Sequence, residues 1–388
     1  MTRALRGFAD GLVSVLLAGY LTRLGCAPLE VGAIVAGTLL GSAALTIAVG
    51  LTGQGIGRRR VLVFAALLML ATGVGFAGLS AFWPLFLVAV VGTLNPTAGD
   101  VSVFLPVEQA VLAETVHGAD RTAVFAWYNV AGTLAGGLGA LASGLPETVA
   151  RLGGIDPLAA ERGGFLFYAA VGALVAGLYR QLSPSVERAA PAGRAPLARS
   201  RSVVLRLAAL FSLDSFGGGF VVQSLLVLWL YRRFQLSVAT AGAIFFAAGM
   251  VGALSQFLSA RLAARIGHVR TMVYTHLPAN LFLVLAGVVP SAPLAVAFLL
   301  LRASLSQMDV PARQAYVMAL VPPEERMAAA SVTNVPRSLA AALPPLLAGM
   351  LLDRSSFGWP LVLGGGLKAL YDVVLLVQFR ALHAPAEP

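Results

Sequence analysis

The sequence has 388 residues, of which 58% are hydrophobic and only 11% are charged, and its mean hydropathy is +0.85. A soluble domain carries about 25% charged residues, so this composition cannot cover a water-facing surface. It excludes a disordered chain, a nucleic-acid-binding protein and a secreted disulfide scaffold, and the single cysteine, Cys26, can form no internal disulfide. The composition instead predicts an all-α membrane protein that crosses the bilayer many times.

Apolar runs predict twelve transmembrane helices, because a helix needs about 20 apolar residues to span a bilayer. The predicted spans cover residues 6–22, 31–52, 61–79, 84–108, 122–144, 163–180, 204–230, 238–260, 270–289, 293–318, 327–351 and 360–380. Turn-forming residues separate these runs, as at Pro322 and Pro323. The first run contains Asp10 and lacks a small-residue cleavage site, so it predicts a helix and not a signal peptide.

The positions of the basic residues predict the orientation. If the N-terminus is cytoplasmic, most of the 27 Lys and Arg residues lie in inner segments, as the positive-inside rule requires. Both termini are therefore predicted to be cytoplasmic, in a multi-pass protein of the cytoplasmic (inner) membrane. The same distribution explains the net charge of +10 without a nucleic-acid partner, and some arginines are expected to contact anionic membrane lipid.

The chain is predicted to consist of two similar halves. Residues 183–203 are rich in Pro, Ala, Arg and Ser and predict a cytoplasmic linker between a six-helix bundle at 1–182 and another at 204–388. The halves match at an offset of 205 to 210 residues. The matched segments include 32–34 with 242–244, Asp100 with Asp309, and Asn129 with Asn334. Two pseudo-symmetric bundles around a central cavity are the architecture of many secondary transporters.

Residues 50–60, between the second and third predicted spans, read Gly-Leu-Thr-Gly-Gln-Gly-Ile-Gly-Arg-Arg-Arg. This segment resembles the signature loop of the major facilitator superfamily, G-x-L-a-D-r-x-G-r-r, with matches at Gly50, Gly57, Arg58 and Arg59. Gln54 stands where the family has an acid, so this chain departs from the pattern at the charge-relay position. The resemblance implies the two-bundle fold, a conformational role for this loop, and alternating-access transport of a small molecule by a monomer.

The segment Gly132–Gly139 is similar to a motif of drug–proton antiporters in the same superfamily, G-x-x-x-G-P-x-x-G-G. Gly137 occupies the position where those proteins have proline. The resemblance implies proton-coupled efflux, with these glycines in gating. Close helix packing is the alternative, because small residues let helices approach closely in lipid.

Four intramembrane acids are candidates for proton coupling or gating, because an ionisable side chain in hydrocarbon is costly unless paired or hydrated. They are Asp10, Asp100, Asp214 and Asp309. Asp100 and Asp309 are equivalent in the repeat, and Asp214 precedes three glycines that predict a hinge or unwound segment. The alternative for Asp100 and Asp309 is a structural role, in which they cap their helices or link them to neighbouring backbone. The alternative for Asp10 is an interface acid that faces Arg6, one turn back.

Arg302 is predicted to lie deep in the tenth span and to need an acid, a polar cavity or an anionic substrate. Asp309, seven residues later, would share its helix face. The other predicted substrate-binding residues are Gln307, Gln223, Asn129, Trp127 and Asn334. Lys368 and Asp372 are predicted to pair with each other, at a spacing of i and i+4. Glu108 is predicted to be a solvated or helix-capping acid.

The sequence contains no phosphate-binding loop, no nucleophile elbow and no metal-binding motif, and its four histidines, His117, His268, His276 and His383, are scattered. We therefore expect no cofactor, no metal and no enzymatic activity. The main hypothesis is a secondary active transporter, with proton-coupled efflux of a small molecule by alternating access. The alternatives are an importer or facilitator of an anionic metabolite, with Arg302 as its counter-ion, and a transport-inactive membrane receptor.

Overall fold

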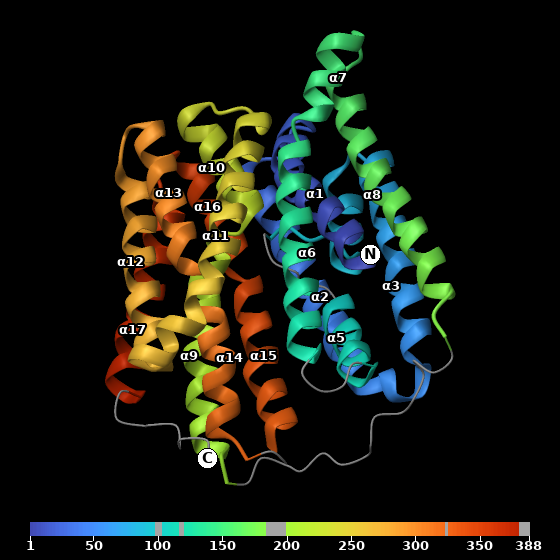
Figure 1. Ribbon diagram of the computed structural model, residues 1–388. Coiled ribbons are helices and arrows are strands. Elements are labelled where there is room, and N and C mark those ends of the chain that lie inside the picture. The colour runs from blue at the N-terminus through green and yellow to red at the C-terminus, as the bar shows by residue number, and fades with distance from the viewer. Residues whose placement is uncertain (98–102, 116–119, 184–198, 323–324, 380–388) are drawn as a thin grey trace. The chain divides into compact units, whose positions relative to one another are not determined.

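The computed structural model describes residues 1–97, 103–115, 120–183, 199–322 and 325–379 (Figure 1). This part of the chain contains helices and no β-strand, which confirms the all-α prediction. The helices pack into two compact units. Unit 1 comprises residues 1–191, 222–249 and 345–354, and unit 2 comprises residues 192–221, 250–344 and 355–388. Most of the predicted linker, residues 184–198, lies outside the described residues, and the domain boundaries at 182 and 204 stay a prediction.

Unit 1 is built on α1, which packs against α6 and α8, while α3 packs along α8 and α2 along α4. The helices of this unit are α1 (Thr2–Arg23), α2 (Pro28–Ile56), α3 (Arg58–Gly78), α4 (Phe82–Val91), α5 (Phe104–Thr115), α6 (Asp120–Ala142), α7 (Leu145–Gly153), α8 (Pro157–Arg180), α10 (Gln223–Phe234), α16 (Pro344–Arg354) and the first part of α11 (Val238–Ile266). The turn between α1 and α2 holds the buried Cys26.

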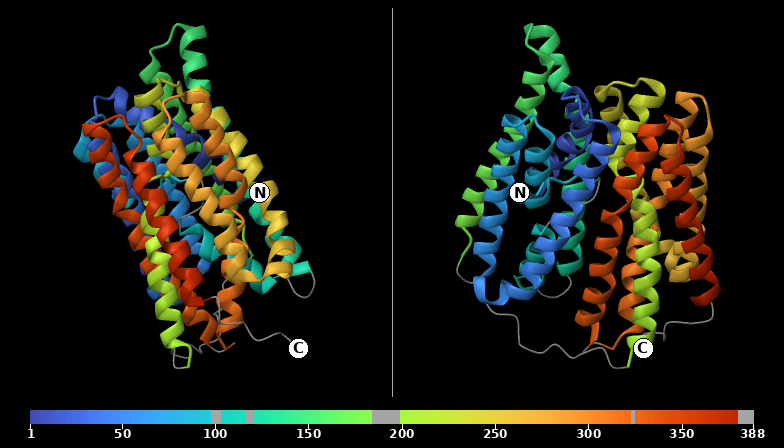
Figure 2. Two further views of the ribbon diagram at one scale, coloured as in Figure 1. Left: turned by 90° about the vertical axis from the view of Figure 1, so that its left-hand side faces the viewer. Right: turned by 180° about the vertical axis from the view of Figure 1, so that it is seen from behind.

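Unit 2 is built on α12, which lies beside α13, α14 and α17, and on α9, which packs against α15 and α17 (Figures 1 and 2). Its helices are α9 (Arg201–Gly219), the rest of α11, α12 (His268–Val288), α13 (Ala292–Ser306), α14 (Asp309–Leu320), α15 (Arg326–Ala342) and α17 (Trp359–Phe379). An apolar cluster from α9, α12, α14 and α17 forms a core of this unit, with Phe211, Met272, Tyr316 and Leu375 among its buried members.

The predicted repeat is visible in the helix boundaries. Helices α2 and α11 both have 29 residues, and α3 and α12, which follow them, both have 21. A single glycine joins each pair: Gly57 has a φ of 82° and Gly267 a φ of 86°. Backbone in this left-handed region is costly for residues with a Cβ, so glycine is the residue that allows the tight connection in both halves.

Nine helical segments of the described residues are long and apolar enough to cross a membrane. The other three predicted spans correspond to α6, part of whose side chains lie outside the described residues, and to the interrupted pairs α4–α5 and α13–α14. The predicted fourth and tenth spans are therefore wrong as continuous helices. Each contains a break, and the breaks occur at corresponding places in the two halves.

The break after α4 contains Asn95 and Pro96. Proline disfavours helical backbone in the residue before it and lacks an N–H, and the Asn95 side chain accepts from the Thr97 N–H at 3.1 Å. Side chains of neighbouring helices bond the freed backbone: Tyr168 donates to the Thr93 carbonyl at 3.0 Å, and Thr72 accepts from the Thr93 N–H at 3.2 Å. An interrupted helix within a membrane requires such partners.

The break between α13 and α14 falls at Gln307 and Met308. Ser259 of α11 donates to the Met308 carbonyl at 2.5 Å, which again bonds a carbonyl that no helix uses. Asp309 lies in the first turn of α14, where an acid is favourable to the helix dipole. The predicted seventh span is also interrupted, since α9 ends at Gly219 and α10 begins at Gln223. This interruption directly follows the three glycines that predicted a hinge or unwound segment.

Glycines on α6 allow its backbone to touch that of α1. A Cβ added to Gly139 would lie 1.9 Å from the Phe8 carbonyl oxygen, and one added to Gly11 of α1 would lie 1.9 Å from the Gly136 carbonyl oxygen. A Cβ at Gly137 would meet only Phe246, at 3.4 Å. The glycine segment that resembles the antiporter motif therefore supports close packing at Gly136 and Gly139, while Gly137 faces another direction.

Candidate functional site

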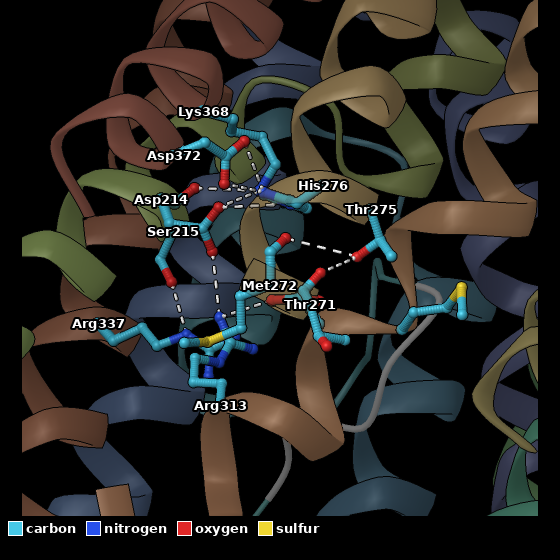
Figure 3. A network of polar contacts seen from close by, with 12 residues as sticks. Asp214, Ser215, Thr271, Met272, Thr275, His276, Arg313, Arg337, Lys368 and Asp372 are labelled. Atoms are coloured by element: carbon cyan, nitrogen blue, oxygen red, sulfur yellow. Dashed lines mark hydrogen bonds and ion pairs between the residues drawn. The ribbon is translucent and has the colours of Figure 1, made fainter. Parts of the chain in front are cut away.

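A group of charged side chains in unit 2 surrounds Asp214, near the C-terminal end of α9 (Figure 3). The Lys368 Nζ of α17 lies 2.5 Å from one Asp214 carboxylate oxygen, and the Arg313 guanidinium of α14 lies 3.3 Å from the other. All three residues are buried: the exposed fractions of Asp214, Lys368 and Arg313 are 4%, 7% and 5%. A buried carboxylate needs such partners, because its ionised form loses its hydration inside the protein.

His276 of α12 lies between two carboxylates of different helices (Figure 3). Its Nδ1 is 2.9 Å and 3.1 Å from the two carboxylate oxygens of Asp372, and its Nε2 is 3.8 Å from Asp214. Asn280, one turn along α12, donates to Asp372 at 2.8 Å. An imidazole placed between two acids can hold or release a proton, and each of its nitrogens faces a group that would bind the N–H.

Arg313 links this group to Asp309, whose carboxylate lies 3.4 Å away on the same helix α14. Arg337 of α15 donates from its Nε to the Ser215 hydroxyl at 2.7 Å. Because Ser215 follows Asp214 in the chain, the two arginines reach neighbouring positions on α9 (Figure 3). We call the set Asp214, His276, Asp309, Arg313, Arg337, Lys368 and Asp372 the unit 2 charge network.

The predicted pair between Lys368 and Asp372 is wrong. Both residues lie on α17, but Lys368 binds Asp214 and Asp372 binds His276. The spacing on one helix is compatible with a contact, but neighbouring helices offer each side chain a closer partner.

The predicted link between Arg302 and Asp309 is wrong as well. The helix ends at Ser306 and restarts at Asp309, so the two residues do not share a helix face. Asp309 instead pairs with Arg313, and the Arg302 Nε is buried with no hydrogen-bond partner among the described residues.

A small cavity in unit 1 brings two other predicted residues together. Asp10 and Gln223 both line it, and both are buried. The other polar lining residues are Arg3, Asn95, Thr97 and Thr133, while glycines of α1 and α6 form much of the remaining wall. The cavity has a volume of about 60 Å³. Gln223 also donates to the Ser14 hydroxyl at 3.0 Å, so its amide is already oriented.

Glu108 is buried, which corrects the prediction of a solvated or capping acid. Arg6 of α1 and Tyr128 of α6 each donate to its Oε2 at 2.5 Å, and Tyr179 of α8 and Thr2 of α1 donate to its Oε1 at 2.5 Å and 2.9 Å. The Arg6 guanidinium also lies over the Phe104 ring, 4.1 Å from its centroid. We call Glu108 with its four donors the Glu108 cluster.

The remaining predicted residues are dispersed. The side chains of Trp127, Asn129, Gln307 and Asn334 are exposed, and none of the four lines the unit 1 cavity. Asp100 lies outside the described residues.

In the predicted conformational loop, Gly50 lies within α2, which continues to Ile56. Gly57 forms the connection to α3. The side chain of Gln54 lies outside the described part of the chain, whereas Arg58 and Arg59 begin α3. Arg59 donates to the Leu182 carbonyl at 3.4 Å.

Five members of the unit 2 charge network were not predicted as site residues. Lys368 and Asp372 were predicted only as a structural pair, and His276, Arg313 and Arg337 were not assigned a site role. Each is an ionisable residue within a predicted span, which is the signal that identified Asp214 and Asp309. His276 was considered only for metal binding. Within the described residues, no group of three or more His, Cys, Asp or Glu side chains is arranged to hold a metal ion.

Comparison with known families identifies the class of this protein. The family model of the Major Facilitator Superfamily matches residues 1–306 and again residues 208–388, which together extend over the whole chain. The chain therefore belongs to the Major Facilitator Superfamily, and it is a membrane transporter and not an enzyme. A relative in Saccharomyces cerevisiae, named Uncharacterized membrane protein YJR124C, is 25% identical over 418 residues, which cover 98% of this chain and 93% of the yeast protein.

Solved structures share the two-bundle fold. The nucleoside transporter NupG is similar with a TM-score of 0.73 and 14% identity, over 98% of this chain and 97% of NupG. A bacterial homolog of the human lysosomal transporter Spinster gives a TM-score of 0.75 with 15% identity, over 99% and 97% of the two chains. The xylose transporter XylE from E. coli gives 0.72 with 14% identity, over 96% and 94%.

Proposed function

We propose that this transporter is a proton-coupled secondary active transporter that exports a small molecule across the cytoplasmic membrane, with both termini in the cytoplasm and a monomer as the working unit. The sequence has no phosphate-binding loop, so an ion gradient is the available source of energy. The observation that carries the proposal is the unit 2 charge network, in which three buried carboxylates from α9, α14 and α17 contact Lys368, Arg313 and His276.

The coupling step follows from the contacts of Asp214. Its charge holds Lys368 of α17 and Arg313 of α14, and His276 of α12 stands at 3.8 Å. A proton on Asp214 would remove that charge and release both cations. Arg313 would keep Asp309 as a partner, whereas Lys368 would lose its only carboxylate in the described residues. Protonation would therefore change how α9, α14 and α17 bind each other. A switch between the inward-facing and outward-facing conformations requires such a change.

His276 is the group we assign to proton transfer within the network. It contacts Asp372 directly and faces Asp214, so a proton can pass between the two acids through its ring. The charged and titratable groups that face these three residues from other helices are Lys368 and Tyr371 on α17, Arg313 and Asp309 on α14, Arg337 on α15 and Arg302 on α13.

The test uses purified protein in vesicles with an imposed pH gradient and a panel of nucleosides, pentoses, carboxylates and lipophilic cations. An antiporter takes up its substrate when the vesicle interior is the more acidic side, because protons leave as substrate enters. One pH unit corresponds to about 1.4 kcal/mol per proton, a tenfold bias. We expect accumulation of at least one solute under this polarity. The opposite polarity would indicate uptake with protons, and no effect of either gradient on any solute would refute proton coupling.

Variants localise the coupling once a solute has been found. His276→Gln is expected to abolish the response to the gradient while exchange of labelled for unlabelled solute continues. The matched control is His268→Gln, because His268 lies on the same helix, eight residues earlier and outside the network. An unchanged gradient response in His276→Gln would remove this residue from the mechanism.

Facilitated movement of an anionic metabolite is the second candidate function. The observation that favours it is Arg302, a deep cation whose Nε has no hydrogen-bond partner among the described residues. In that case the panel would show flux of an anion that no pH gradient accelerates.

A further inference from the structure

The unit 2 charge network and Arg302 together contain four permanent cations and only three acids. Three carboxylates, Asp214, Asp309 and Asp372, contribute negative charge. Lys368 and Arg313 bind the first two, whereas His276, which is a cation only when protonated, contacts the third. Arg337 then remains as a fixed positive charge, and Arg302 adds another that interacts with Asp214 without an ion pair. The surplus lies on side chains that cannot readily discharge, because arginine stays protonated in proteins.

Arg337 is the cation with the clearest unused binding capacity. Of its five N–H hydrogens, the one on Nε binds the Ser215 hydroxyl at 2.7 Å. Among the described residues, no carboxylate lies within 4.0 Å of this guanidinium, and its two terminal nitrogens donate to no protein acceptor. The side chain is partly buried on α15, so bulk water does not fully replace an acidic partner.

The surroundings of Arg337 increase its need for a counter-ion. Arg313 is close enough to repel it, as the two side chains reach Asp214 and Ser215, which are adjacent on α9 (Figure 3). Asp214 and Asp309 attract Arg337, but neither forms an ion pair with it, because both already bind Arg313 and Asp214 also binds Lys368. Two like charges held together in a poorly hydrated place are unfavourable unless an anion lies beside them.

Ser215 adds a second donor directed to the same place. Its oxygen accepts from Arg337, which leaves its own hydroxyl hydrogen free to donate, and no described residue accepts it. A guanidinium with free terminal nitrogens presents two parallel N–H groups that match a carboxylate or phosphate. A hydroxyl beside them supplies a third hydrogen bond to the same group.

We propose that Arg337, positioned by Ser215 and beside Arg313, binds the carboxylate or phosphate group of an anionic substrate. The proposal names the substrate class of the transporter and rests on its proposed transport function. A phospholipid headgroup carries the same chemistry, so the experiment must separate a soluble anion from a lipid.

The test measures equilibrium binding to the purified full-length protein in detergent at constant pH and ionic strength. Thermal shift and calorimetry would compare succinate with neutral succinamide, and inorganic phosphate with glycerol. Phosphatidylglycerol would be compared with glycerol 3-phosphate. We expect at least one soluble anion to raise the melting temperature, because a ligand that binds the folded state stabilises it by mass action. Its neutral counterpart should have no effect.

Variants of Arg337 decide whether this residue is the binding site. Arg337→Gln should lower the affinity for that anion by at least tenfold. Arg337→Lys should lower it by less, because lysine keeps the positive charge but lacks the two parallel N–H groups of the guanidinium. Without anion, Arg337→Gln should melt no lower than the native protein, because it removes an unpaired charge. Arg270→Gln, at an exposed position on α12 of the same unit, is the matched control and should bind like the native protein.

Three results would overturn the proposal: an unchanged affinity in Arg337→Gln, a lower melting temperature of that variant without ligand, or stabilisation by phosphatidylglycerol alone. Binding needs no gradient, so its failure is distinct from a failure of proton coupling. An anion that binds without any pH-driven flux would refute the proposed coupling and leave the binding site intact.

Discussion

Two buried carboxylates, Glu108 in unit 1 and Asp214 in unit 2, are held in different ways. Glu108 receives one cation, Arg6, and three hydroxyl donors that complete both of its oxygens. Asp214 receives two cations and faces a histidine, and two of these three partners also contact a second acid. Among the described residues, Arg313 and His276 each contact a second acid besides Asp214, so these partners of Asp214 are shared between acids.

The difference separates a structural contact from one that can change. A proton on Glu108 would leave Arg6 without this carboxylate and weaken hydrogen bonds from α1, α6 and α8 together. A proton on Asp214 would redistribute contacts, because Arg313 keeps Asp309 and His276 keeps Asp372. The sharing of partners between described acids is therefore what makes the unit 2 charge network suited to coupling.

The largest effect should follow the loss of the single cation of the Glu108 cluster. Arg6→Met is expected to lower the free energy of unfolding by about 3–5 kcal/mol, because it leaves a buried carboxylate without its cation. Denaturant unfolding of the purified protein in detergent measures this. The exposed Arg60→Gln is the control, and adding Glu108→Met to Arg6→Met should restore part of the loss. Native-like stability of Arg6→Met would contradict the comparison.

A smaller loss is expected from the corresponding change in unit 2. Lys368→Met should cost about 1.5–3 kcal/mol, the contribution of a hydrogen bond to a charged group, because Asp214 retains Arg313 and still faces His276. The same unfolding experiment measures it, with Lys368→Arg as the variant that keeps the charge. If Lys368→Met were as destabilising as Arg6→Met, the distinction between the two sites would fail.

The smallest expected effect concerns the helices that carry the Glu108 cluster. Gly139→Ala should destabilise by about 1–3 kcal/mol, the usual cost of overpacking, because its Cβ would collide with the α1 backbone. Gly137→Ala is the matched control on the same helix, and it should be neutral or slightly stabilising, since alanine favours a helix more than glycine does. Thermal unfolding compares the two variants. Equal losses would show that α6 does not use these glycines for contact with α1.

The sequence alone predicts much of this fold because its strongest signals are local. Apolar length locates most helices, and Gly57 and Gly267 mark equivalent connections in the two halves. The breaks in the fourth and tenth predicted spans were missed as breaks, although the local signals were present in Asn95 and Pro96. The hydropathy of the fourth predicted span indicates one continuous apolar run. The hydrogen bonds that stabilise its break come from other helices, which the local sequence does not reveal.

The candidate site is less predictable, for a physical reason. An acid within an apolar run is recognisable from its cost in lipid, which identified Asp214 and Asp309. The residue that pairs with the acid is not recognisable from the sequence, because the pairing depends on which helices pack together. Lys368 therefore binds an acid 154 residues away in place of the one a turn along its own helix. His276 was set aside because isolated histidines carry no sequence motif, and only packing places it between two acids.

The single cysteine has a practical consequence. Cys26 is buried in the turn between α1 and α2, and burial, with a smaller effect from Glu30, raises the pKa of its thiol. Little reactive thiolate is then present at neutral pH, so maleimide reagents should label it slowly. A fluorophore or spin label attached to one introduced surface cysteine would therefore report on a chosen helix during the transport cycle, with the native thiol left in place.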